Sequence, residues 1–171
     1  VLDRRRIELV EPGMPEAPVH HVGGPWELHR TGDPVDDEEL AALVTQVRAA
    51  ATRATTAALD ALAAEVGGPV RSLSLAAWPD DFPTDIAVVR RVPHESRADS
   101  VMYRQVLAEV AGERDWAVHR YEPKRVEADA AAVLGERADE VLHGPRRTLG
   151  PPWTKDHRTA LAATVLAAAP G

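Results

Sequence analysis

The sequence predicts a single α/β domain with three layers, in which helices cover both faces of a central mixed sheet. The chain has 171 residues, of which 44% are hydrophobic, and this is enough for one domain with a buried core. After residue 70, β-rich runs alternate with stretches that keep helical spacing. Such alternation is typical of a mostly parallel sheet with covering helices. We therefore treat residues 1–171 as one α/β domain.

The first part of this domain, residues 1–34, contains short extended candidates separated by proline and glycine. We expect them to extend the sheet as antiparallel strands. The candidates are RRIELV (5–10), PVHHV (18–22) and WELHR (26–30).

A long helix is predicted over residues 35–66. Asp36 and Asp37 suit a helix N-terminus, and apolar residues follow at helical spacing from Leu40 onward. The helix should end at Gly67. A helix of this length spans roughly 45 Å, at 1.5 Å per residue. Because it would be longer than the core of a small domain, we expect one end to project or to pair with a second copy in a homodimer.

Residues 70–171 show the alternation of strands and helices. We expect the runs 86–91 and 116–121 to be adjacent parallel strands, joined by a helix over 97–113. The strands predicted here are VRSLSLAAW (70–78), IAVVRRV (86–92) and WAVHRY (116–121). The helices predicted here are 97–113, opened by Ser96 and Asp99 as a capping signature, 123–135, 136–143 and 155–169, the last capped by Thr154.

Composition limits the classes of function. The absence of cysteine excludes disulfides, thiolate metal sites and cysteine nucleophiles. The formal charge of −7 argues against a general nucleic-acid coat, although it leaves room for a local basic cleft that binds DNA or RNA. No apolar run approaches the roughly 20 residues of a membrane helix, and we see no signal-peptide core. We therefore expect a cytoplasmic protein that does not bind membranes.

Three acids occupy positions where an α/β sheet usually carries its site. Glu11 and Glu95 follow predicted strands, and Asp156 lies in the first turn of the last helix. Carboxylates gathered in this way are suitable ligands for Mg²⁺, which could position a phosphodiester for hydrolysis. Each acid also has a structural interpretation. Glu11 precedes Pro-Gly in a turn, Glu95 flanks the Ser96 cap, and Asp156 is favoured by the helix dipole.

Basic side chains near the same positions could hold a phosphate substrate. Lys124 follows a predicted strand, and Lys155, His157 and Arg158 surround Asp156 in the last helix. These four residues are the candidate substrate-binding groups.

Three stretches resemble the RuvC family of Holliday-junction resolvases, which has the ribonuclease H-like fold. IELVEPG (7–13) resembles the family's first strand, which ends in Asp-Pro-Gly, so Glu11 stands where the family has aspartate. Residues 98–135 resemble its helix–strand–helix block, and KDHRTALAA (155–163) resembles its last acidic helix. The resemblance implies a ribonuclease H-like fold and a Mg²⁺-dependent nuclease.

Two functions therefore remain open. The first is a Mg²⁺-dependent nuclease or resolvase-like enzyme in which Glu11, Glu95 and Asp156 serve both as catalytic residues and as metal ligands. The alternative is a non-catalytic protein of ribonuclease H-like or other α/β fold that binds a protein partner. The two would be distinguished by whether the three carboxylates meet around one metal ion.

Overall fold

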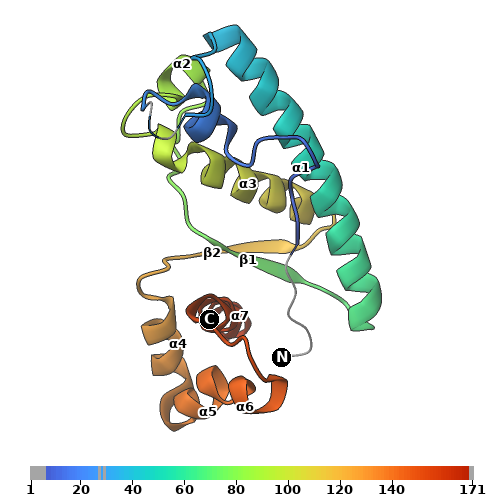
Figure 1. The fold of residues 1–171 in the computed structure, drawn as a ribbon. Coiled ribbons are helices and arrows are strands. Elements are labelled where there is room, and N and C mark those ends of the chain that lie inside the picture. The colour runs from blue at the N-terminus through green and yellow to red at the C-terminus, as the bar shows by residue number, and fades with distance from the viewer. Residues whose placement is uncertain (1–6, 27, 29, 170–171) are drawn as a thin grey trace. The chain divides into compact units, whose positions relative to one another are not determined.

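The computed structural model describes residues 7–26, 28 and 30–169, and helices predominate, with 59% helix and 6% strand. Figure 1 shows the elements in the order of the chain. They are η1 (Pro18–Gly23), α1 (Asp37–Val66), β1 (Ser72–Ala76), α2 (Ile86–Val89), α3 (Glu95–Gly112), β2 (Ala117–Tyr121), α4 (Val126–Leu134), η2 (Gly135–Arg137), α5 (Ala138–His143), α6 (Pro145–Leu149) and α7 (Lys155–Ala168).

The predicted three-layer α/β fold with a central mixed sheet is wrong. The part of the chain that the structure describes contains one sheet of two parallel strands, β1 and β2. Their register places Ser72 opposite Ala117 and Ala76 opposite Tyr121. A sheet this narrow cannot form a layer with helices on both faces, so most of the core lies between helices.

The predicted strand over 86–92 is a short helix, α2, so the predicted pairing of 86–91 with 116–121 is also wrong. Asp85 begins the turn, because its side chain accepts a hydrogen bond from the Ala87 N–H at 2.9 Å. Ile86 and Val89 then share one face and pack in the same hydrophobic cluster, whereas Val88 is 42% exposed. A spacing of three belongs to a helix and not to a strand. Four hydrophobic residues in a row could not distinguish the two.

The predicted strand over 18–22 is also helical. η1 is a π-helical turn that begins with Pro18, a residue that suits the first position of a helix. The other two N-terminal candidates, 5–10 and 26–30, lie partly outside the described residues, and residues 7–9 form no regular strand.

Most of the other predicted elements are confirmed. α1 covers the long helix, β1 and β2 lie within two of the predicted strands, and α3 follows the predicted helix 97–113. α4, α5 and α7 also lie where they were predicted, and Gly135 ends α4 with φ 57°, a conformation that favours glycine. These elements carry local signals such as helical spacing, caps and glycine stops, which act within a few residues of one another.

The chain divides into two compact units. The helical unit comprises the described residues of 7–65 and 78–110, with η1, α2 and nearly all of α1 and α3. The sheet unit comprises the described residues of 66–77 and 111–171, with the strand pair and α4 to α7.

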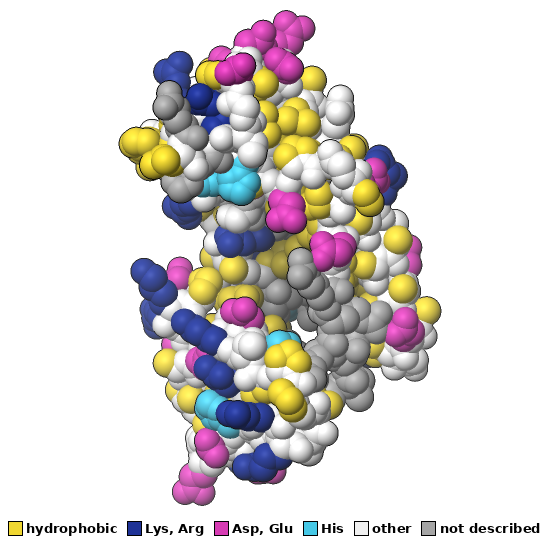
Figure 2. All heavy atoms as spheres, in the orientation of Figure 1, with side chains coloured by type: hydrophobic (Ala, Val, Ile, Leu, Met, Phe, Trp, Pro, Cys, Tyr) yellow, Lys and Arg dark blue, Asp and Glu magenta, His cyan; other side chains and the backbone are white. Residues whose placement is uncertain are grey.

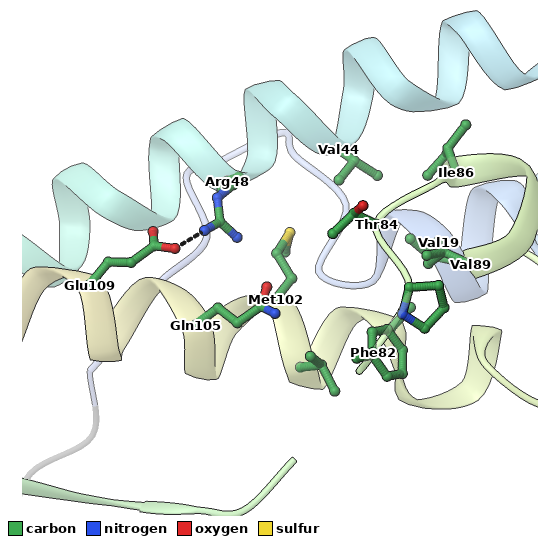
Figure 3. Close-up of a pocket in the computed structure, with 13 residues that line it drawn as sticks. Val19, Val44, Arg48, Phe82, Thr84, Ile86, Val89, Met102, Gln105 and Glu109 are labelled. Carbon is green, nitrogen blue, oxygen red and sulfur yellow. Dashed lines mark hydrogen bonds and ion pairs between the residues drawn. The ribbon is translucent and has the colours of Figure 1, made fainter. Parts of the chain in front are cut away.

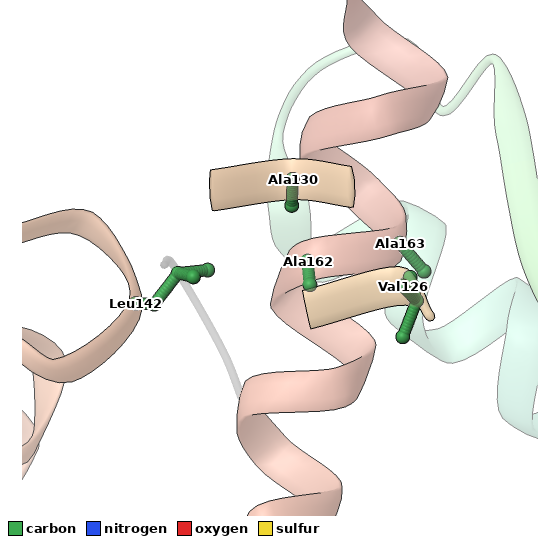
Figure 4. Packing of buried hydrophobic residues seen from close by; sticks show 5 residues of the cluster. All are labelled: Val126, Ala130, Leu142, Ala162 and Ala163. Atoms are coloured by element: carbon green, nitrogen blue, oxygen red, sulfur yellow. The ribbon is translucent and has the colours of Figure 1, made fainter. Parts of the chain in front are cut away.

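The sheet unit is packed by small apolar residues on facing helices. Val126 and Ala130 of α4 contact Ala162 and Ala163 of α7, and Leu142 of α5 completes the cluster (Figure 4). All five are at most 4% exposed. Alanines at the contact allow the two helices to approach closely, and α7 also packs on β1.

The helical unit has larger buried side chains, which α1 and α3 contribute at helical spacing. Leu40 and Val47 of α1 are at most 1% exposed, as are Val101, Val106 and Val110 of α3. This repeat is the amphipathic pattern expected of core-facing helices.

Candidate functional site

Glu11, the first predicted metal ligand, lies in a turn and forms an ion pair. Its backbone carbonyl accepts a hydrogen bond from the Met14 N–H at 3.1 Å. Its Oε1 accepts hydrogen bonds from Arg53, at 2.7 Å from Nη2 and 3.2 Å from Nε. The Glu11 side chain is 41% exposed, so this contact is a surface ion pair with little effect on stability.

Glu95, the second predicted ligand, is the first residue of α3 and is buried, at 4% exposure. Its Oε1 lies 3.6 Å from Nδ1 of His20, which η1 brings over α3. A buried carboxylate is costly unless it has a partner, and an imidazole can supply one. Glu95 is therefore part of the contact between η1 and α3.

Asp99 completes this contact one turn further along α3. Its two carboxylate oxygens accept hydrogen bonds from the backbone N–H groups of Val19 and His20, each at 2.9 Å. Sequence reasoning paired Asp99 with Ser96 as a cap of α3, but α3 begins at Glu95 and Asp99 instead caps η1. Burial raises the pKa of the Asp99 carboxyl, and the two backbone hydrogen bonds oppose part of that rise.

Tyr103 lies one further turn along α3 and fixes the segment before η1. Its hydroxyl donates a hydrogen bond to the backbone carbonyl of Glu16 at 2.9 Å. Burial, together with the negative charges of Asp99 and Glu16, raises the pKa of Tyr103 to about 12. Glu95, Asp99 and Tyr103 thus form one row on α3 that holds η1. Pro18 is a sequence signal that fits the start of η1, although a strand was predicted there. No local signal connected η1 with Asp99, which lies 80 positions after Val19.

Asp156, the third predicted ligand, lies in the sheet unit and is exposed. The spacing of Asp156 with Ala160 and Ala163 predicts that Asp156 continues the buried face of α7, and this prediction is wrong. The inward positions of the first turns belong to Arg158 and Thr159, which donate hydrogen bonds to the Glu127 carboxylate at 3.3 and 3.1 Å. The acid that needs a partner in this region is therefore Glu127.

The start of α7 is a capping box, as the Thr154 cap predicted. Nδ1 of His157 accepts a hydrogen bond from the Thr154 backbone N–H at 3.1 Å, in the position usually held by glutamate. Trp153 stacks on the His157 ring with 5.5 Å between centroids and donates a hydrogen bond to the Leu142 carbonyl. These contacts give His157 a structural role.

The other predicted substrate-binding residues are exposed or are used in the fold. Lys124 and Lys155 are exposed, and Arg158 is paired with Glu127. Over residues 7–26, 28 and 30–169, no three His, Asp or Glu side chains lie together as a metal site. The described residues therefore give no support to a magnesium centre formed by Glu11, Glu95 and Asp156.

A cleft in the helical unit is the feature best suited to binding. It has a volume of about 410 Å³ and lies between α1, α3 and residues 82–89. Its floor is apolar and buried, with Val19, Val89, Ala98, Val101 and Met102 at 8% exposure or less. Figure 3 shows Val44 and Ile86 at one end and the ion pair of Arg48 with Glu109 at the other. The chain's single phenylalanine, Phe82, forms part of the wall.

Acidic residues adjoin one wall of this cleft in the sequence. Asp80, Asp81 and Asp85 flank the wall residues 82–84, and Glu109 lines the cleft itself. Arg48 is the basic residue among those lining it, and its charge is balanced by Glu109. A ligand in the cleft would therefore meet an apolar floor next to an acidic segment of the chain.

The charge of the whole chain is unevenly divided. Residues 7–65 and 78–110 hold 17 acidic and seven basic residues, a net charge of −10. Residues 66–77 and 111–171 hold nine acidic and ten basic residues. Figure 2 shows acidic side chains over the first turns of α1, and basic ones over the α4 to α6 face of the sheet unit.

Comparison with known proteins adds no relative. No protein family matches the chain, and neither a curated protein nor a solved structure is similar to it. None of the described helices is long and apolar enough to cross a membrane.

Proposed function

We propose that the chain is a non-catalytic binding protein whose cleft in the helical unit receives a cationic amphipathic helix of a protein partner. The observation that carries this proposal is a cleft with an apolar lining, in a unit of negative net charge. Clefts with a mostly apolar lining and a few polar groups are typical binding sites of folded proteins. It also agrees with the partner-binding alternative that the sequence left open.

The size and shape of the cleft support a helical peptide. At about 410 Å³ it can take a few large apolar side chains. It runs between two neighbouring helices, and an amphipathic helix binds such a groove through residues spaced three or four apart. Met102 in the floor is an adaptable side chain that suits such contacts.

The charge of the helical unit supports a cationic partner. The helical unit carries −10, Glu109 lines the cleft, and Asp80, Asp81 and Asp85 adjoin its wall residues in the sequence. Lysine or arginine on the solvent side of a bound helix would be attracted to these acids, and the attraction would decrease as salt is added.

The experiment is a fluorescence anisotropy titration of the full chain with a labelled helical peptide of leucine and lysine. We expect the peptide to bind, and its affinity to decrease as salt is added. The Gln105→Trp variant should bind the peptide at least about tenfold more weakly, since the indole would fill the cleft. The matched control is Gln46→Trp, at an exposed position of α1 that does not line the cleft. Equal loss in both variants, or equal affinity for a leucine–glutamate peptide, would refute the proposal.

The Mg²⁺-dependent nuclease remains a competing prediction. The binding proposal predicts no cleavage of branched DNA in the presence of Mg²⁺ or Mn²⁺. Cleavage by the natural chain that Asp156→Asn abolishes, with the fold preserved, would replace the binding proposal with the enzyme.

The homodimer through α1 and the cytoplasmic location also remain predictions. The side of α1 that carries Leu40, Val47, Ala51, Thr55 and Leu59 is buried within the protein, so a second copy would have to use another side of the helix. Sedimentation at several protein concentrations would test the dimer.

A further inference from the structure

A second hollow in the helical unit is lined by three arginines. It has a volume of about 290 Å³, at the lower end of the range for ligand pockets, and so suits a small ion or group rather than a nucleotide. Arg30, Arg90 and Arg91 line it together with one acid, Asp37. The remaining lining residues are Gly23, Gly24, Pro25 and Pro34.

The charge of this hollow is opposite to that of its surroundings. Three guanidinium groups and one carboxylate give it a formal charge of +2, within a unit of net charge −10. Cations gathered around one space repel each other unless an anion lies between them. Asp37 neutralises one of the three positive charges, because it forms an ion pair with Arg90.

Arg90 is held rigidly in place. Its Nε donates a hydrogen bond to the Gly23 carbonyl at 3.0 Å, and its Nη2 donates one to the Val35 carbonyl at 2.8 Å. Its Nη1 binds Asp37, and its side chain is only 17% exposed. A guanidinium has five N–H donors, so these three bonds leave two.

Arg30 is fixed in a similar way by backbone carbonyls. Its Nε donates to Gly32 at 3.1 Å and its Nη1 to Gly24 at 3.5 Å, which leaves three N–H donors. Arg91 is exposed and makes no ion pair with the described residues. Two oriented guanidinium groups and one exposed one therefore line the same small space.

We propose that this hollow binds a phosphate group, either as inorganic phosphate or as a small phosphate monoester. Phosphate offers several acceptor oxygens and close to two negative charges, which match the spare donors and the formal charge of the hollow. Arginine binds phosphate through paired hydrogen bonds, and these charge-assisted bonds are stronger than neutral ones. The site is independent of the cleft proposed above, since none of the residues lining it lines that cleft.

Calorimetric titration of the full chain with inorganic phosphate and with glycerol phosphate, in chloride of matched ionic strength, tests the site. We expect one site per chain with a Kd of about 1 mM or lower for at least one of the two ligands. Arg91→Gln should weaken binding about tenfold, because it removes charge-assisted donors without disturbing Arg90. Binding of one ligand alone identifies the source of the phosphate group.

The matched control is Arg97→Gln, which removes the same charge from an exposed position of α3 that does not line the hollow. We expect its affinity to equal that of the natural chain. The proposal is overturned if neither ligand binds above the chloride background, or if Arg97→Gln weakens binding as much as Arg91→Gln does.

Discussion

Different kinds of contact stabilise the interior of each unit. The sheet unit has an apolar cluster of valine, alanine and leucine between α4, α5 and α7, and its charges nearly balance. The helical unit buries two carboxylates, Glu95 and Asp99, and carries a net charge of −10. The net charge of −7 for the whole chain is the sum over two regions of unlike charge. The acidic composition of the chain alone is therefore a poor guide to its partners.

This difference also bears on where binding sites lie. Both proposed sites are in the helical unit, where polar and apolar groups are combined around clefts. In the sheet unit, Thr154, His157 and Glu127 fix the unit's own helices. The following predictions test the contrast between a unit that depends on buried polar contacts and one that depends on apolar packing.

The largest effect is expected for Asp99→Ala in the helical unit. The substitution leaves the Val19 and His20 N–H groups without their acceptor, at about 1–3 kcal/mol each, offset in part because a buried charge is removed. We expect a loss of about 3 kcal/mol in the free energy of unfolding, and a loss of hydrogen-exchange protection in η1. Asp81→Ala, an exposed control, should change stability by less than about 0.5 kcal/mol. An equal loss of hydrogen-exchange protection in α4 and α7 would contradict the expectation that Asp99 stabilises the helical unit alone.

In the sheet unit, the next largest effect is expected for Val126→Ala. Val126 is 1% exposed in the cluster between α4 and α7, so its truncation leaves a cavity that costs about 2 kcal/mol. Val133 on the same helix is 55% exposed, and Val133→Ala should cost less than about 0.5 kcal/mol. Urea denaturation of both variants would measure the difference. Similar losses for both would mean that α4 is not packed as the structure has it.

A smaller effect is expected for Thr154→Ala at the start of α7. Loss of the capping threonine should cost about 1 kcal/mol, and Thr154→Ser should restore most of it. Hydrogen exchange in the first turn of α7 would report the change locally. Unchanged exchange in the alanine variant would show that His157 and Trp153 suffice to hold this turn.

The last effect is confined to alkaline solution and is expected from Tyr103. Its pKa is about 12 in the folded protein against 10.0 ordinarily, so the stability it contributes is present below pH 10 and is lost as the pH rises through 12. Ionised Tyr103 also cannot donate its hydrogen bond to the Glu16 carbonyl. Tyr103→Phe should lose less stability between pH 10 and 12 than the natural chain. Tyrosinate absorbance with the same midpoint in folded and unfolded protein would contradict this.

The sequence predicted the elements whose signals are local. The spacing of Leu40 and the residues after it, the glycine stop at Gly135 and the threonine cap at Thr154 each act within one or two helical turns. It failed at residues 86–89, because a run of four hydrophobic residues fits a buried strand as well as a helix. It also could not predict either cleft, since their walls come from segments of the chain that are far apart in sequence.

For the candidate site, the sequence by itself determined which residue types were available: acids without cysteine, few lysines, and one phenylalanine in an acidic loop. Only the tertiary structure decided how they are used. Asp99 meets residues 79 and 80 positions earlier, and Arg90 joins Gly23, Val35 and Asp37. The physical reason is that a carboxylate or guanidinium can bind a local partner, as Asp85 does, or a distant one, and the sequence does not decide between them. The role of such a group is set by whichever backbone or charged groups the packing of other elements brings within hydrogen-bond distance.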